Sequence, residues 1–127
     1  MNRDDVDAFE KVVGQLDGLH NEISIMARKS SNDGLNTFKL KFVNAVLDQC
    51  NIILGNKYSP FPDFKQFDPN ELPSNSDVTL MLGQYLKAAE KFRSDNIYKP
   101  DGDRKWYWRV SKGGGVIRTH PPLNLKD

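Results

Sequence analysis

The sequence has little cysteine, no long hydrophobic run and almost no net charge. A single cysteine, Cys50, excludes an intramolecular disulfide, which suits a reducing compartment. No stretch approaches the roughly 18 apolar residues that a membrane span needs. The N-terminal stretch MNRDDVDAFEK is acidic and polar, unlike a signal peptide. We therefore expect a cytoplasmic protein that does not enter a membrane.

Catalytic and metal-binding motifs are also missing from the sequence. Two histidines and one cysteine are too few for a structural zinc site, and no EF-hand spacing occurs. There is no G-x-S-x-G nucleophile motif and no Walker loop. Cys50 falls in an apolar helical stripe, where a thiol is expected to be buried and inert. We predict no catalytic residue, no metal and no cofactor, and hence a protein that is not an enzyme.

The length and the charge distribution point to one domain with a basic C-terminal part. A chain of 127 residues is expected to form a single domain over residues 1–127. The formal net charge of +1 gives no overall field to attract a polyanion. From Met1 to Ile97 there are 11 Lys and Arg against 14 Asp and Glu, a balance of −3. From Tyr98 to Asp127 the counts are 7 and 3, a balance of +4.

Hydrophobic residues recur at helical spacing in three segments, which predicts helices over about 4–29, 34–54 and 76–96. In the first segment the stripe consists of Val6, Phe9, Val13, Leu16, His20, Ile23 and Ala27. The second stripe consists of Leu35, Phe38, Phe42, Val46, Cys50 and Ile53. The third consists of Val78, Met81, Leu82, Tyr85, Ala89 and Phe92. Three such helices are expected to pack as a small bundle.

The segment between the second and third helices is rich in proline and aromatic residues. Its four prolines exclude a regular helix. Tyr58, Phe61, Phe64 and Phe67 recur at every third residue, which predicts a polyproline-like or 3₁₀ path that lays its aromatic side on a surface. We expect an ordered loop across the helices, because disordered linkers are poor in aromatic residues.

The C-terminal part predicts a β-hairpin over about 105–119. Trp106, Trp108 and Val110 alternate with Tyr107 and Arg109, which is typical of a half-buried strand. The stretch SKGGG is a connection of hairpin length, and VIRT is a short β-branched run. An isolated hairpin is marginally stable in water, so both tryptophans are expected to pack on the helices. The predicted fold is therefore mainly α, a three-helix bundle with a C-terminal β-hairpin packed on it.

The first helix carries a candidate surface for self-association. Its stripe extends over nearly three heptads, which fits either a seam between two chains or, as we favour, the core face of a bundle helix. Two glycines four residues apart suggest a close backbone approach to another helix or to a partner chain. The candidate residues are Val13, Gly14, Leu16, Gly18 and His20. Whether His20 is a core residue or a functional one stays open.

The predicted hairpin carries a candidate nucleic-acid or anion surface. Outward cations on a β-ribbon can contact phosphates, and an aromatic side chain can stack on a base. The candidate residues are Arg104, Lys105, Tyr107, Arg109, Lys112, Arg118 and His120. The alternative is a solvated strand face, and the nearly neutral overall charge favours that alternative.

These observations favour a non-catalytic function. We expect a cytoplasmic protein-binding, adaptor or regulatory accessory protein that forms homo-oligomers and binds another protein, whose identity the sequence does not reveal. The alternative is a nucleic-acid-binding accessory protein that uses the basic, aromatic hairpin.

Overall fold

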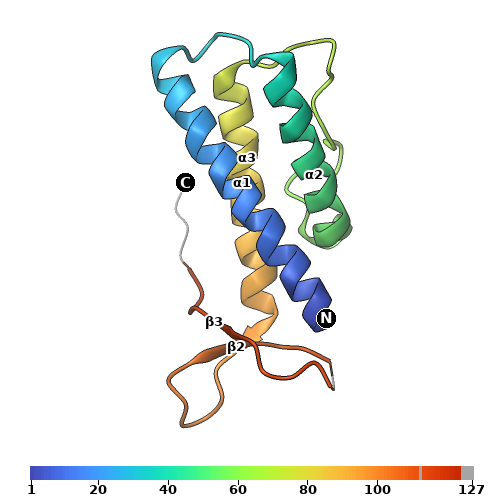
Figure 1. The fold of residues 1–127 in the computed structure, drawn as a ribbon, viewed down its shortest axis with the longest axis vertical. Coiled ribbons are helices and arrows are strands. Elements are labelled where there is room, and N and C mark those ends of the chain that lie inside the picture. The colour runs from blue at the N-terminus through green and yellow to red at the C-terminus, as the bar shows by residue number, and fades with distance from the viewer. Residues whose placement is uncertain (112, 124–127) are drawn as a thin grey trace.

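The computed structural model describes residues 1–111 and 113–123, and it contains three long helices and a small sheet. The helices α1 (Arg3–Lys29), α2 (Thr37–Tyr58) and α3 (Asn75–Asp95) lie side by side, and the sheet lies at the end of the bundle where α1 begins and α3 ends (Figure 1). The antiparallel sheet has the order β1 (Ile97–Tyr98), β2 (Trp106–Trp108), β3 (Arg118–Thr119). The prediction of a mainly α fold with a β element packed on a bundle is confirmed.

Local capping interactions explain where two of the helices begin. At α1, the Asn2 side chain accepts a hydrogen bond of 2.8 Å from the Asp5 N–H, and the Asp5 carboxylate accepts one of 2.9 Å from the Asn2 N–H. At α3, the Ser74 hydroxyl accepts a hydrogen bond of 3.1 Å from the Asp77 N–H. Each cap provides a partner for an N–H group that the first turn of a helix cannot satisfy.

Helix α2 begins and ends later than about 34–54. Its N-terminal cap is Asn36. The helix starts after Leu35 because Leu35 is fully buried and its N–H donates to the Pro73 carbonyl at 2.8 Å, outside the helix. Gly55 has a φ of +62°, a left-handed conformation that interrupts the helix, and one further turn reaches Tyr58.

The sheet has three strands rather than the two of the predicted hairpin. The additional strand β1 follows α3 directly and pairs with β2, placing Ile97 opposite Trp108. Strand β2 also pairs with β3, which places Trp106 opposite Thr119 and Tyr107 opposite Arg118. Two residues are too few to produce an alternating pattern, so the sequence did not reveal β1.

The sheet is joined to the helices by a small hydrophobic cluster that includes Val6, Phe9, Ala89, Ile97 and Trp108. Trp108 is 2% exposed, and its indole meets the Phe9 ring edge to face at 5.3 Å. The expectation that the tryptophans are core residues is thus confirmed for Trp108. Trp106 is half-buried at the edge of the same cluster.

The loop between α2 and α3 follows the bundle surface, as the aromatic pattern predicted, with one exception. Phe64 and Phe67 meet edge to face at 5.0 Å and pack against the main core. The Asn44 side chain bonds both the N–H and the carbonyl of Phe67 at 2.9 Å. Phe61, by contrast, is 45% exposed.

Candidate functional site

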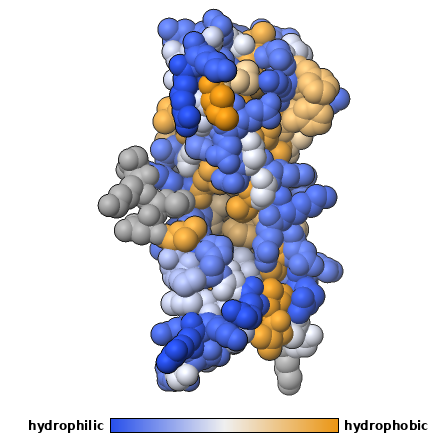
Figure 2. Space-filling model, turned by 60° about the vertical axis from the view of Figure 1, so that its left-hand side comes forward, coloured by the Kyte–Doolittle hydropathy of each residue, from blue (hydrophilic) through white to orange (hydrophobic). Residues whose placement is uncertain are grey.

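A groove of about 560 Å³ lies between α1, α3 and residues 118–123. Figure 2 shows hydrophobic atoms in the middle of this face, with hydrophilic residues around them. The apolar lining residues are Phe9, Val13, Leu86, Ala89, Trp108 and Leu123. The polar and charged ones are Glu10, Asp17, Glu90, Arg93, Arg118, Thr119 and His120, and Gly14 completes the lining. The groove therefore combines a hydrophobic floor with charged edges.

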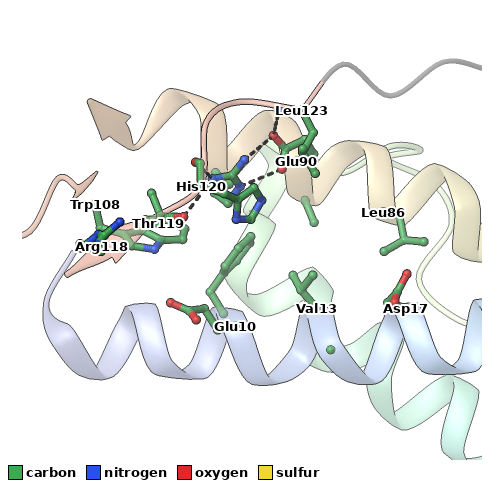
Figure 3. A pocket seen from close by; sticks show the side chains of 14 residues that line it. Glu10, Val13, Asp17, Leu86, Glu90, Trp108, Arg118, Thr119, His120 and Leu123 are labelled. Carbon is green, nitrogen blue, oxygen red and sulfur yellow. Dashed lines mark hydrogen bonds and ion pairs between the residues drawn. The ribbon is translucent and has the colours of Figure 1, made fainter. Parts of the chain in front are cut away.

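The α1 edge of the groove is acidic. Glu10 and Asp17 are seven residues apart, two helical turns, and therefore lie on the same face of α1 (Figure 3). Both are exposed, and among the described residues neither carboxylate forms an ion pair or a hydrogen bond through its side chain. Val13 and Gly14 lie between them, and nothing lies within 4 Å of the position that a Cβ atom would take at Gly14. An approaching ligand can therefore reach the α1 backbone at this point.

The opposite edge is held by a buried ion pair on α3. The Arg93 guanidinium donates two hydrogen bonds of 2.8 Å to the Glu90 carboxylate. Its other N–H groups donate to the Thr119 hydroxyl at 3.0 Å and to the carbonyls of His120 and Pro121 at 2.7 and 2.8 Å. All five N–H groups of Arg93 are thus used, and the segment after β3 is fixed against α3.

Glu90 receives further hydrogen bonds, which affect its pKa. Burial alone would raise the pKa of the Glu90 carboxyl, but the hydrogen bonds from Arg93 and from the Leu123 N–H lower it below its ordinary value. The Leu123 N–H lies 2.8 Å from Glu90 Oε2. Glu90 is therefore an ionised structural partner of Arg93.

Trp108, which lines the groove, carries an unsatisfied polar group. Its Nε1–H is buried and has no hydrogen-bond partner among the described residues. A buried donor without a partner carries a free-energy cost of about 1–3 kcal/mol. Figure 3 shows Trp108 and Glu10 at the same end of the groove.

The sequence identified neither the acidic edge nor the ion pair, although both leave a signal. Glu10 and Asp17 share a helical face with Gly14. Arg93 follows Ala89 by four residues and so continues the apolar stripe of the third helix. A charged residue at such a position indicates a buried and paired side chain.

The residues predicted for self-association do not form one surface. Leu16 is fully buried in the bundle core, so the folded chain cannot offer it to a second copy. Val13 is half-buried, while Gly14 and Gly18 are exposed. His20 is half-buried, and its Nε2 lies 3.5 Å from the position of a Cβ atom at Gly83. That distance is an ordinary van der Waals contact between α1 and α3, and nothing lies within 4 Å of a Cβ position at Gly14 or Gly18, so neither glycine allows a close approach within this chain. Self-association itself stays a prediction.

The predicted basic surface is divided between two places on the sheet. Arg104, Lys105, Arg118 and His120 gather with Trp106, Thr119 and Pro121 around a second pocket of about 460 Å³. Arg109 instead lies over the Tyr98 ring at 5.1 Å, beside a different depression. The Tyr107 hydroxyl donates to the Asp103 carboxylate at 3.1 Å. Lys112 lies outside the described residues.

Within residues 1–111 and 113–123, no group of three or more His, Cys, Asp or Glu side chains could hold a metal ion. No helix in this described part of the chain is both long enough and apolar enough to cross a membrane.

In comparisons with known proteins, no family model matches the chain, and no curated protein or solved structure matches it significantly.

Proposed function

We propose that this protein is a non-catalytic protein-binding module, an adaptor or regulatory factor, that binds a segment of a partner protein in the groove between α1 and α3. The observation that supports this proposal is the apolar floor of the groove beside two exposed carboxylates, Glu10 and Asp17, which have no ion-pair partner in the part of the chain that the structure describes. A groove of about 560 Å³ lies within the usual range for ligand sites, about 300–1,000 Å³.

The charges of the groove select the kind of segment it binds. Glu10 and Asp17 complement a Lys or Arg of the partner, and Val13 and Leu86 complement an aliphatic or aromatic side chain next to it. The missing side chain at Gly14 leaves room for the partner's backbone. The occupant is therefore a short segment in which a large apolar side chain is flanked by a cation, and the apolar side chain supplies most of the binding energy.

A matched pair of variants tests this proposal. Gly14→Trp fills the groove, whereas Gly18→Trp places the same side chain one turn further along, at a residue that does not line the groove. Both glycines are exposed with open space around them, so both variants should fold. Peptides selected from a random display library on the wild type should share an apolar residue beside Lys or Arg. They should lose binding to Gly14→Trp and keep it with Gly18→Trp.

Two results would contradict the proposal. One is a library that yields no enriched peptide, and the other is a set of peptides that bind both variants equally well. Replacing Glu10 and Asp17 by Gln and Asn should also weaken the selected peptides, and the loss should shrink at high salt because exposed charges are screened.

We further propose that the protein acts in the cytoplasm. The supporting observation is that Cys50 is buried and that burial raises the pKa of its thiol to about 12. Such a thiol stays protonated and unreactive at neutral pH, and a chain with one buried cysteine has no need of an oxidising compartment.

A further inference from the structure

The pocket around Trp106 combines basic side chains from two segments that are distant in sequence. Strand pairing places Trp106 opposite Thr119, and continuing the same register places Lys105 opposite His120. Arg104 and Arg118 line the same pocket. Four basic side chains thus meet at one end of the β2–β3 pair, beside an indole that is half-buried.

The charges of this pocket are available to a ligand. No carboxylate from the described part of the chain lines the pocket. In that part, Arg104, Lys105, Arg118 and His120 form no ion pair. The neighbouring Asp103 carboxylate already accepts hydrogen bonds from the Lys105 N–H at 2.9 Å and from the Tyr107 hydroxyl at 3.1 Å.

The wall of the pocket is also held in place. Thr119, His120 and Pro121 all line the pocket, and each receives a hydrogen bond from Arg93. Arg93 is 4% exposed and is fixed in turn by Glu90. The ligand therefore meets a preorganised surface, which lowers the entropic cost of binding.

We propose that this pocket binds single-stranded nucleic acid, with phosphates at Arg104, Lys105 and Arg118 and one base against Trp106. The cations match phosphate oxygens, and the accessible part of the indole offers a surface on which an unpaired base can stack. A duplex suits the pocket less, because its bases are already stacked on one another. This inference goes beyond the proposed function, because it concerns a different ligand in a neighbouring pocket, which shares Arg118, Thr119 and His120 with the groove.

The test is a fluorescence anisotropy titration of the full chain with a short labelled oligothymidylate, at low salt and then at rising salt. Three phosphate contacts at about 0.7 each should give a slope of log affinity against log salt of about −2. Arg104→Ala and Arg118→Ala should each weaken binding and reduce this slope by about 0.7. Arg109→Ala is the matched control, since it removes the same charge from the sheet outside the pocket and should leave both quantities unchanged.

Trp106→Leu keeps an apolar side chain at the edge of the core and removes the stacking surface. It should weaken oligothymidylate binding about five-fold or more, which corresponds to the lower limit of base–aromatic stacking. Thermal unfolding of each variant establishes that it is folded. Duplex of the same length and vesicles containing phosphatidylserine should bind more weakly than the single strand.

Several results would overturn the proposal. These are no binding of oligothymidylate at low salt, equal losses in Arg109→Ala and Arg118→Ala, and unchanged binding by Trp106→Leu. Stronger binding of the duplex or of the vesicles would likewise assign the pocket to a different ligand. Arg104 and Trp106 line the basic pocket but not the groove between α1 and α3, so their variants test this proposal separately from the proposed function.

Discussion

Arg93 and Glu90, three residues apart on α3, are joined by two hydrogen bonds of 2.8 Å, and Arg93 simultaneously binds the segment that follows β3. Their side chains are 5% and 12% exposed. This pair connects the bundle to the C-terminal segment. Both residues line the groove, and Arg93 also holds Thr119 in the wall of the basic pocket. The two candidate sites therefore depend on one buried ion pair.

Arg93→Met should lower the free energy of unfolding by about 3–5 kcal/mol, because it leaves the Glu90 carboxylate buried without its cation. Urea denaturation followed by circular dichroism measures this loss. Lys91→Met is the control, since Lys91 forms an exposed ion pair with Asp95 on the same helix, and the loss of such a pair should have little effect on stability. Equal effects of the two substitutions would show that the buried pair has no special role.

The same pair makes stability depend on pH. In the folded protein the pKa of Glu90 lies below its ordinary value of 4.5. Burial alone would raise this pKa, but the hydrogen bonds from Arg93 and Leu123 lower it by more. Below pH 4.5 the unfolded chain therefore binds more protons at this residue than the folded chain. The contribution of the pair is complete above pH 4.5 and is lost as the pH falls through the lowered value. Urea midpoints of wild type and Glu90→Gln should accordingly converge on acidification, and a constant difference would refute this.

Gly14→Ala and Gly18→Ala should each stabilise the protein by up to about 1 kcal/mol, because alanine has the higher helix propensity. Both glycines lie inside α1, and nothing within 4 Å of the new Cβ atoms opposes them. Thermal unfolding measures the gain. A loss of stability at either position would mean that the glycine makes a close contact in the folded state.

Trp108→Ala should cost about 3–5 kcal/mol, the usual range for a large buried aromatic residue. Trp106→Ala should cost less, because this side chain is half-buried at the edge of the cluster. Chemical denaturation of the two variants gives the comparison. Equal costs would contradict the different burial of the two tryptophans.

The fold was largely predictable because it depends on local patterns. The helical stripes and the caps at Asn2 and Ser74 involve residues a few positions apart, so the positions of α1 and α3 follow closely from the sequence. The start of α2 could not be predicted in this way, because it depends on a hydrogen bond between Leu35 and Pro73, which lies far along the chain. Strand β1 was not predicted for a similar reason, because its two residues form a strand only through their pairing with β2.

The candidate sites were less predictable because they depend on which segments meet in space. The stripe of α1 led us to include Leu16 in a self-association surface, yet packing places it in the core. Leu16→Glu should therefore unfold the chain rather than produce a folded monomer. Conversely, the sequence predicts one surface for the basic residues near the C-terminus, but in the folded chain Arg104 and Arg118 line one pocket and Arg109 lines another.

The most direct test of the groove is to map a selected peptide on the protein by NMR. Amide chemical shifts of wild type, titrated with the unlabelled peptide, should change mainly within residues 9–17, 86–93 and 118–123. A rival surface is the outer side of α2, where Phe38 is 70% exposed and Ile52 is 74% exposed. Shifts confined to the three groove segments are the result that the proposal predicts, and shifts concentrated around Phe38 and Ile52 would contradict it.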